Sequence, residues 1–125
     1  MHRLVWVLQV VLGIYFVAIG VVHFVVPEDL PAQLAWMYDL PTELHYLGGA
    51  AEILGGLGLI LPAWTRIRPG LTPLAAAGLT IVMLLAAVWH LQRGETQNLA
   101  SNLVLAALLV LIAYVRWRRH PIPGR

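Results

Sequence analysis

The sequence contains neither cysteine nor lysine. Without cysteine, the chain forms no disulfide, no thiolate metal site and no dithiol redox centre. Without lysine, it cannot form the Schiff base with which many enzymes activate carbonyl substrates, and all eight Lys+Arg positions are arginine. Charged residues make up only 11% of the chain, against about 25% in an average soluble domain. The net charge of +2 is too small to indicate a nucleic-acid partner.

Hydrophobic residues take the place of charge and fill 60% of the 125 positions. They form four long apolar segments, and a helix needs roughly 20 apolar residues to cross the hydrocarbon core of a bilayer. The sequence therefore predicts an all-α fold, a single-domain integral membrane four-helix bundle over residues 1–125 in contact with the lipid bilayer. The predicted helices span residues 4–26, 46–63, 71–91 and 98–116, and we expect their ends near Pro27, Pro62, Pro69 and Pro121.

Arginine is unevenly distributed among the segments that connect these helices. Segments that face the cytoplasm are enriched in basic residues. The first loop has four acids and no arginine, whereas seven arginines lie at the N-terminus, in the second loop and at the C-terminus: Arg3, Arg66, Arg68, Arg116, Arg118, Arg119 and Arg125. This distribution predicts that both termini are cytoplasmic (N-in/C-in). We expect the run from Arg116 to Arg119 to anchor the last helix at anionic lipids.

The first loop, Pro27–His45, is the longest and would lie on the outer side of the membrane. Its segment DLPAQLAWMYDLPTEL alternates acids with leucine, tryptophan, methionine and tyrosine between prolines. This pattern favours a short interfacial helix that covers the outer end of the bundle as a lid. An ordered connector without such a role is the alternative.

Most polar residues inside the predicted helices fall at one depth. A rise of 1.5 Å per residue places His23, Glu52, His90 and Asn102 in the half of the bundle away from the termini. An isolated carboxylate in hydrocarbon is costly, so we expect Glu52 to pair with His23 or His90. Small residues beside Glu52 allow close helix packing, and the first helix carries a packing stripe at 4-3-4-3 spacing: Gln9, Gly13, Phe16, Gly20 and His23.

Glu52, His90 and His23 are the candidate acid/base residues, with a purely structural role for Glu52 as the alternative. The candidate ligand-binding residues are His23, Glu52, His90, Asn102, Trp89 and His45. His45 at the interface could instead be solvated, and Asn98 and Asn102 could serve as a helix cap and in interhelical hydrogen bonds. The histidines and the carboxylate match the ligand count of zinc or non-haem iron, but no spacing such as H-x-x-x-H accompanies them. No metal site is therefore predicted, and haem ligation by His23 and His90 is a lesser alternative.

Four stretches of the sequence match one family: GVVHF (20–24) followed by VP, GGAAEILGGLGLILP (48–62), LTPLAAAGLTIVMLLAAVWHLQRGE (71–95), and a final apolar helix with a basic tail. Over essentially its whole length the sequence resembles the DoxX-like family of small four-helix membrane proteins. The resemblance implies that His23, Glu52 and His90 are motif residues. Relatives include a subunit of a quinone-linked thiosulfate oxidoreductase, a mycobacterial subunit of a redox-stress complex and animal receptor-assembly chaperones. A redox role in this chain cannot use thiols.

Three hypotheses follow for function. In the first, the chain is an accessory or ligand-binding subunit of a redox or stress assembly in the bacterial inner membrane, and an outward-facing pocket of Glu52, His23 and His90 holds a lipophilic molecule such as a quinone. In the second, it is a small membrane enzyme that performs acid/base chemistry on a lipophilic substrate. In the third, it is a structural or assembly protein that binds a membrane protein partner or a second copy of itself, without pocket chemistry.

Overall fold

The computed structural model describes residues 2–124, in which all regular secondary structure is helical. Arg125, one of the arginines that predict orientation, lies outside the described residues. The four long helices are α1 (His2–Val25), α2 (Thr42–Thr65), α3 (Leu71–Gln92) and α4 (Thr96–Tyr114). A 3-10 helix, η1 (Ala32–Asp39), lies between α1 and α2, and a π-helical turn, η2 (Val115–Arg119), continues α4.

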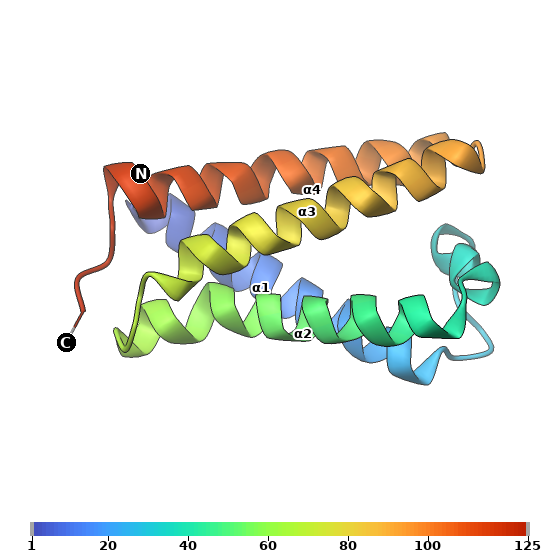
Figure 1. Cartoon of the computed structure of the whole chain (residues 1–125), viewed down its shortest axis with the longest axis horizontal. Helices are drawn as coiled ribbons and strands as arrows, with labels where there is room; N and C mark the ends of the chain where they lie inside the picture. The colour runs from blue at the N-terminus through green and yellow to red at the C-terminus, as the bar shows by residue number, and fades with distance from the viewer. Residues whose placement is uncertain (1, 125) are drawn as a thin grey trace.

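The helices α1, α2, α3 and α4 with η2 are each long and apolar enough to cross a membrane. The predicted fold class, all-α with four helices long and apolar enough to span a membrane, is therefore confirmed. Both chain ends lie at the same end of the bundle, here called the termini end (Figure 1). At the opposite end, the η1 end, the α1·α2 pair and the α3·α4 pair diverge, and η1 lies across the opening (Figure 1).

Each helix buries one narrow stripe and leaves an apolar surface outside. The buried residues of α1 include the whole predicted stripe of Gln9, Gly13, Phe16, Gly20 and His23. A core cluster of apolar side chains from all four long helices fills the interior, among them Phe16, Leu59, Leu79, Leu109 and Ile112, each at most 1% exposed. The outward faces carry leucine, valine and isoleucine, as expected where lipid is the solvent.

Two pairs of glycines set the distance between α1 and α2. A Cβ atom on Gly56 would lie 2.6 Å from the carbonyl oxygen of Gly13, and one on Gly49 would lie 2.9 Å from that of Gly20. Backbone therefore packs directly on backbone, which only small residues permit. The second pair lies one helical turn from His23 and Glu52, so these contacts bring the histidine and the acid together.

The helix α2 passes through Pro62, near which we expect an end, and stops at Thr65, two residues beyond the predicted range of 46–63. Proline has no N–H and cannot donate to the carbonyl oxygen four residues earlier, which belongs to Gly58. The hydroxyl of Thr72 on α3 donates to that carbonyl oxygen instead, at 2.9 Å. Neighbouring helices commonly satisfy backbone groups freed by proline in membrane helices, so the helix does not need to stop. At its other end α2 begins at Thr42, four residues before the predicted start.

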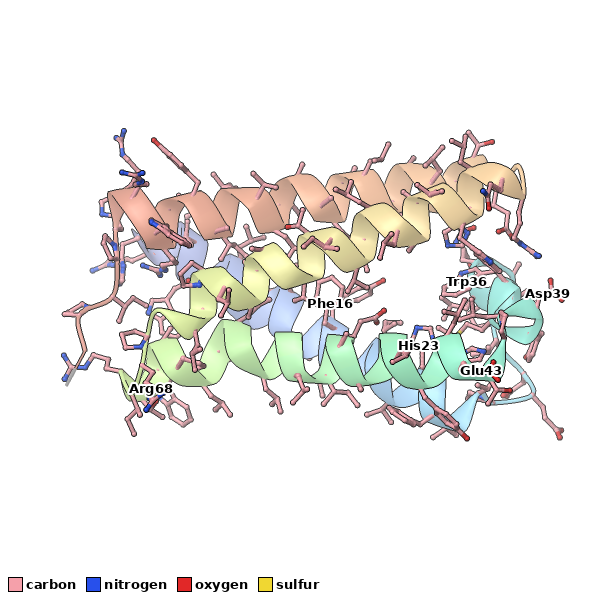
Figure 2. All side chains as sticks on the ribbon, in the orientation of Figure 1. Phe16, His23, Trp36, Asp39, Glu43 and Arg68 are labelled. Carbon is pink, nitrogen blue, oxygen red and sulfur yellow. The ribbon has the colours of Figure 1, made fainter. Side chains whose placement is uncertain are left out.

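Charge separates along the bundle. Figure 2 shows Asp39 and Glu43 at the η1 end and Arg68 at the termini end, with His23 and Trp36 close to each other beneath η1. The separation agrees with the arginine distribution in the sequence, because the same two ends carry the acidic first loop and the basic second loop.

Candidate functional site

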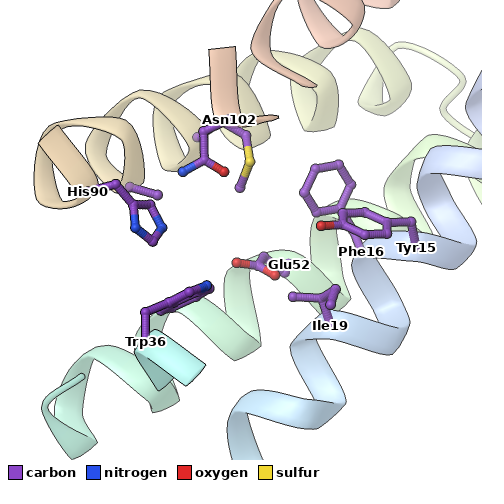
Figure 3. A pocket seen from close by; sticks show the side chains of 9 residues that line it. Tyr15, Phe16, Ile19, Trp36, Glu52, His90 and Asn102 are labelled. Carbon is purple, nitrogen blue, oxygen red and sulfur yellow. The ribbon is translucent and has the colours of Figure 1, made fainter. Parts of the chain in front are cut away.

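A small cavity lies inside the bundle near the η1 end, with the Glu52 side chain pointing into it (Figure 3). All four long helices and η1 contribute to its wall, which consists of Tyr15, Phe16, Ile19, Trp36, Glu52, Met83, Ala86, His90 and Asn102. Its volume is about 40 Å³. A single water needs roughly 10–15 Å³, so the cavity has room for about three waters or one small polar group.

Three buried polar atoms of this wall have no hydrogen-bond partner among residues 2–124: Glu52 Oε2, Trp36 Nε1 and Asn102 Nδ2. Glu52 is only 5% exposed. Leaving a buried polar atom unsatisfied costs about 1–3 kcal/mol, and such atoms are rare in native proteins. The three side chains come from different elements and line the same space (Figure 3). The cavity therefore offers two donors and one acceptor to a group that enters it.

The other carboxylate oxygen of Glu52 faces α1. Glu52 Oε1 lies 3.5 Å from His23 Nε2, which is within ion-pair range but longer than the roughly 2.7–3.2 Å of an N–H···O hydrogen bond. His23 Nδ1 lies 2.9 Å from His45 Nδ1, and His45 Nε2 donates to the carbonyl oxygen of Met37 at 2.7 Å. The predicted pairing of Glu52 with His23 is present. The alternative in which His45 is simply solvated is wrong, because η1 covers this side chain and leaves it 7% exposed.

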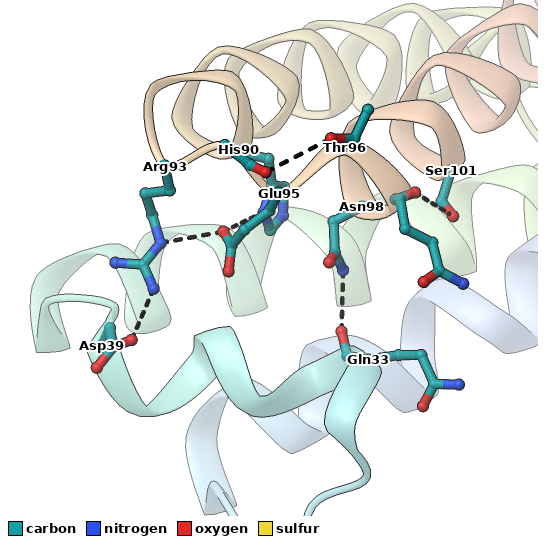
Figure 4. Close-up of polar contacts among 10 residues, drawn as sticks. Gln33, Asp39, His90, Arg93, Glu95, Thr96, Asn98 and Ser101 are labelled. Atoms are coloured by element: carbon teal, nitrogen blue, oxygen red, sulfur yellow. Dashed lines mark hydrogen bonds and ion pairs between the residues drawn. The ribbon is translucent and has the colours of Figure 1, made fainter.

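His90 lines the cavity but pairs with a different acid. Its Nδ1 atom lies 2.9 Å from Glu95 Oε1 in the turn between α3 and α4 (Figure 4). Arg93 Nε also donates to Glu95 Oε1, at 3.0 Å, and Arg93 Nη2 reaches Asp39 Oδ2 on η1, at 2.6 Å. A continuous polar chain thus runs from the cavity wall to the outside of η1.

The charged groups between His90 and Asp39 stabilise one another. Desolvation acts to raise the pKa of Glu95, but the hydrogen bonds and charges of His90 and Arg93 outweigh it, so the pKa of Glu95 lies below its ordinary value. The hydrogen bond to Glu95, with a further one to Asp39, raises the pKa of Arg93. At neutral pH Arg93 therefore bridges two carboxylates and ties η1 to the α3–α4 turn.

Other contacts hold η1 over the cavity. Asn98 Nδ2 on α4 donates to the carbonyl oxygen of Gln33 at 2.9 Å (Figure 4), so Asn98 binds η1 and is not the cap of its helix. The Trp36 ring lies edge-on to His90 at a centroid distance of 4.9 Å, and 5.9 Å from the His23 ring. A short helix thus lies where the sequence predicts one, with one aromatic side chain, Trp36, inserted between α1 and α3.

The candidate residues divide into two groups. Glu52, His90 and Asn102 line the cavity, whereas His23 and His45 stand behind Glu52. Trp89 is not in the cavity wall; its ring contacts Trp36 and lies beneath the Arg93 guanidinium. Among residues 2–124, no group of three or more His, Asp or Glu side chains is placed to hold a metal ion.

Sequence reasoning missed two polar side chains of the cavity wall, Trp36 and Tyr15, and the partner of His90. Trp36 lies in the first loop, which has no helical periodicity, and the lipid-facing position of Tyr15 hides the inward direction of its hydroxyl (Figure 3). Glu95 lies outside the predicted helices. Its spacing from His90, five residues across a helix end with Gly94 between them, is the signal that could have revealed the pair.

A second buried polar cluster lies at the termini end. Arg116 is 3% exposed and donates from Nε to Gln9 Oε1 at 2.5 Å, and from Nη1 to His2 Nδ1 and to the carbonyl oxygen of His120. Gln9 Nε2 donates to the carbonyl oxygen of Leu59 at 2.8 Å. The lipid-anchor prediction is therefore wrong for Arg116, since the π-helical turn η2 directs it inward. Arg118 and Arg119 remain exposed.

Comparison with known proteins gives one match. The sequence profile of the DoxX-like family matches residues 7–112, which include every residue of the cavity wall and exclude η2. No curated protein and no solved structure matches the chain.

Proposed function

The chain belongs to the DoxX-like family, and we propose that it is a ligand-binding subunit. Its cavity would take the polar head group of a lipophilic molecule. One observation carries the proposal: Glu52 Oε2, Trp36 Nε1 and Asn102 Nδ2 face one cavity without partners. Retaining three unsatisfied buried groups costs stability, and a bound ligand that satisfies them would offset that cost.

A quinone suits this donor and acceptor set. The carbonyl oxygen of a quinone accepts hydrogen bonds, and Trp36 Nε1 and Asn102 Nδ2 are donors. The hydroxyl group of the reduced form donates, and Glu52 Oε2 accepts. The same three atoms could therefore form hydrogen bonds to the head group in both its oxidised and its reduced form. A quinone site in a redox assembly has to hold both forms.

The size of the cavity limits how such a ligand is held. Ligand pockets usually measure about 300–1,000 Å³, far more than this cavity. In the present conformation, only the polar end of the ligand fits, so binding of a whole ring requires η1 to move outward with Trp36. Tyr15 is 40% exposed on the α1 side of the cavity, and we expect a lipid-soluble molecule to approach along this face.

The same proposal includes an orientation. With Arg66 and Arg68 at the termini end and Asp39 and Glu43 at the η1 end, the positive-inside rule supports cytoplasmic termini in a bacterial inner membrane (Figure 2). The cavity then lies in the outer half of the bilayer beneath η1. A membrane protein partner that carries a redox centre would exchange electrons with the bound ligand.

Acid/base catalysis on a lipophilic substrate is the second candidate, and the geometry of Glu52 favours it. One carboxylate oxygen faces the cavity, while the other faces His23 at 3.5 Å. A carboxyl group held in this way can exchange a proton with a bound molecule while a histidine stabilises its charge. Isomerisation, or epoxide opening with water as the nucleophile, would need no cofactor.

The first test is ligand extraction. Protein purified in mild detergent should yield a quinone or another lipophilic molecule on solvent extraction and mass spectrometry, or should bind an added short-chain quinone. Asn102→Leu should reduce binding at least tenfold, because it replaces the donor that faces the cavity with a methyl group of similar size. Ser101→Leu is the matched control, since Ser101 is exposed on the same helix and bonds only to the Gln97 carbonyl oxygen.

Three results would separate the candidates. Loss of binding in Asn102→Leu but not in Ser101→Leu supports the ligand site. Turnover of an isomerisation or epoxide substrate that Glu52→Gln abolishes supports the enzyme. Absence of both ligand and turnover, with one membrane protein co-purifying, would leave an assembly role and end the ligand proposal.

A further inference from the structure

Behind the cavity, three ionisable side chains lie in a row. Glu52 Oε1 is 3.5 Å from His23 Nε2, His23 Nδ1 is 2.9 Å from His45 Nδ1, and His45 Nε2 is 2.7 Å from the carbonyl oxygen of Met37. The three side chains are between 4% and 7% exposed. The row begins at the cavity and ends beneath η1.

The bonding partners determine where the protons are. The Met37 carbonyl oxygen can only accept, so His45 Nε2 carries a proton. At 2.9 Å, the two Nδ1 atoms share a hydrogen bond with one proton between them. If both rings are neutral, His45 Nδ1 is the acceptor and His23 Nδ1 the donor. His23 Nε2 then has no proton of its own and directs a lone pair toward Glu52.

A further proton must lie at the Glu52 end of the row. Two acceptors cannot face each other there without repulsion, and an unpaired carboxylate in apolar surroundings is costly. The proton belongs either to Glu52 as a carboxylic acid or to His23. The row therefore holds three protons, one on His45 Nε2, one between the Nδ1 atoms and one between His23 and Glu52, and its net charge is zero.

Two proton shifts connect the two charge distributions of this row, and the first requires Glu52 Oε1 and His23 Nε2 to approach from 3.5 Å to hydrogen-bond distance. The Glu52 proton moves to His23 Nε2, and the His23 Nδ1 proton moves to His45 Nδ1. The row then consists of a Glu52 carboxylate, a neutral His23 and a His45 imidazolium. The effect is the transfer of one proton from the cavity carboxyl group to a histidine beneath η1, with no change in total charge.

We propose that Glu52, His23 and His45 form a proton relay between the cavity and the outside, closed at its outer end by the Met37 carbonyl of η1. In the resting structure His45 Nε2 is bonded to η1, so the relay exchanges protons with water only when η1 moves. The role of the relay rests on the proposed function, because a bound ligand that gives a proton to Glu52 Oε2 would supply the proton that the relay carries outward. His90 is not part of it, because its Nδ1 atom bonds to Glu95.

Nuclear magnetic resonance of ¹⁵N-histidine-labelled protein in lipid nanodiscs, with no ligand added, tests the relay. The wild type should show a nitrogen–nitrogen coupling across the His23–His45 hydrogen bond, and a His45 Nδ1 shift between the protonated and unprotonated values. Glu52→Gln should move that shift to the unprotonated value, because an amide donates to His23 Nε2 but cannot release its proton. His90→Gln, the control in the same cavity, should leave the coupling and the shift unchanged.

The reverse experiment keeps the test independent of how Glu52→Gln folds. His45→Gln should abolish the coupling and change the ¹³C shift of the Glu52 carboxyl group. A missing coupling in the wild type, a His45 shift that ignores Glu52→Gln, or equal responses to Glu52→Gln and His90→Gln would overturn the relay. Because no ligand takes part, failure here leaves the proposed ligand site standing, and failure to find a ligand leaves the relay standing.

Discussion

The two ends of the bundle both bury polar side chains, but they satisfy them differently. At the termini end, Arg116 and Gln9 bond to each other and to groups on α1, α2 and the chain beyond η2. At the η1 end, Glu52, Trp36 and Asn102 each leave a buried atom without a partner among residues 2–124. A satisfied polar network in a membrane fixes the positions of helices, whereas an unsatisfied one weakens the fold.

This difference separates a structural cluster from a candidate site. Arg116, in the turn η2 that continues α4, bonds to Gln9 on α1, and Gln9 bonds to Leu59 on α2, at the termini end. At the η1 end, contacts with Arg93, Asn98 and His45 hold η1 in place. In the described part of the chain, the polar groups that join the helices and the polar groups without partners therefore lie at opposite ends.

The largest effect is expected at the termini end, for Gln9→Leu. Leucine leaves the buried Arg116 Nε without its acceptor, which should lower the free energy of unfolding by about 3 kcal/mol. Unfolding in mixed detergent micelles, followed by circular dichroism, measures the change. Gln9→Glu is the control: it keeps an acceptor for Arg116 and should cost much less. Equal stability of Gln9→Leu and wild type would show that this cluster does not hold the bundle together.

The next largest effect concerns the glycines that position Glu52. Gly49→Ala places a methyl group 2.9 Å from the Gly20 carbonyl oxygen and 3.0 Å from His23 Cβ, so α1 and α2 must separate. Overpacking of this kind costs about 1–3 kcal/mol. In Gly48→Ala the methyl group meets nothing within 4 Å, so stability should be unchanged. Unfolding of both variants in the same micelles provides the comparison, and equal losses would contradict direct packing of backbone on backbone.

A smaller effect of opposite sign is expected in the cavity. Asn102→Leu removes a buried donor that has no partner, so the free energy of unfolding without ligand should stay within about 1 kcal/mol of wild type or rise. The same variant should lose the added stability that a bound ligand gives the wild type. Thermal unfolding with and without short-chain quinone measures both quantities. A loss as large as that of Gln9→Leu would mean that Asn102 is structural.

Much of the fold and part of the site follow from sequence periodicity. The stripe from Gln9 to His23 and the small residues beside Glu52 predicted which helix faces pack against a neighbour, because helical spacing alone determines which residues share a face. The cost of burying an unpaired acid predicted a histidine partner for Glu52 but did not choose between His23 and His90. In contrast, the continuation of α2 through Pro62 depends on a hydroxyl from α3, a tertiary contact that no local rule contains.

The rest of the site depends on segments without periodicity. Trp36 reaches the cavity because η1 folds back over the bundle, and the direction of that turn is not encoded in the alternation of acids and apolar residues. His90 could have paired with Glu52 or Glu95; the turn at Gly94, with φ of 72°, brings Glu95 back to it. Arg116 turns inward at a π-helical turn, which a helical wheel of 3.6 residues cannot anticipate.

The smallest effect is expected from pH, at the contact that ties η1 to the α3–α4 turn. Because the pKa of Glu95 is lower in the folded protein, its stabilising contribution is present above the ordinary value of 4.5 and is lost as pH falls through the folded value. Protonation weakens the bonds to Arg93 and His90, so η1 should open more often in acid. Hydrogen–deuterium exchange of the η1 amides should show this opening as reduced protection below about pH 4.5.

Glu95→Gln is the matched variant for this measurement. It should reduce the protection of η1 at neutral pH and flatten the dependence on pH, while the amides near Arg116 keep wild-type protection in both proteins. Identical pH profiles for wild type and Glu95→Gln would show that Glu95 does not help to hold η1. The contacts of Arg93, Asn98 and His45 with η1 would then be sufficient to close the cavity without it.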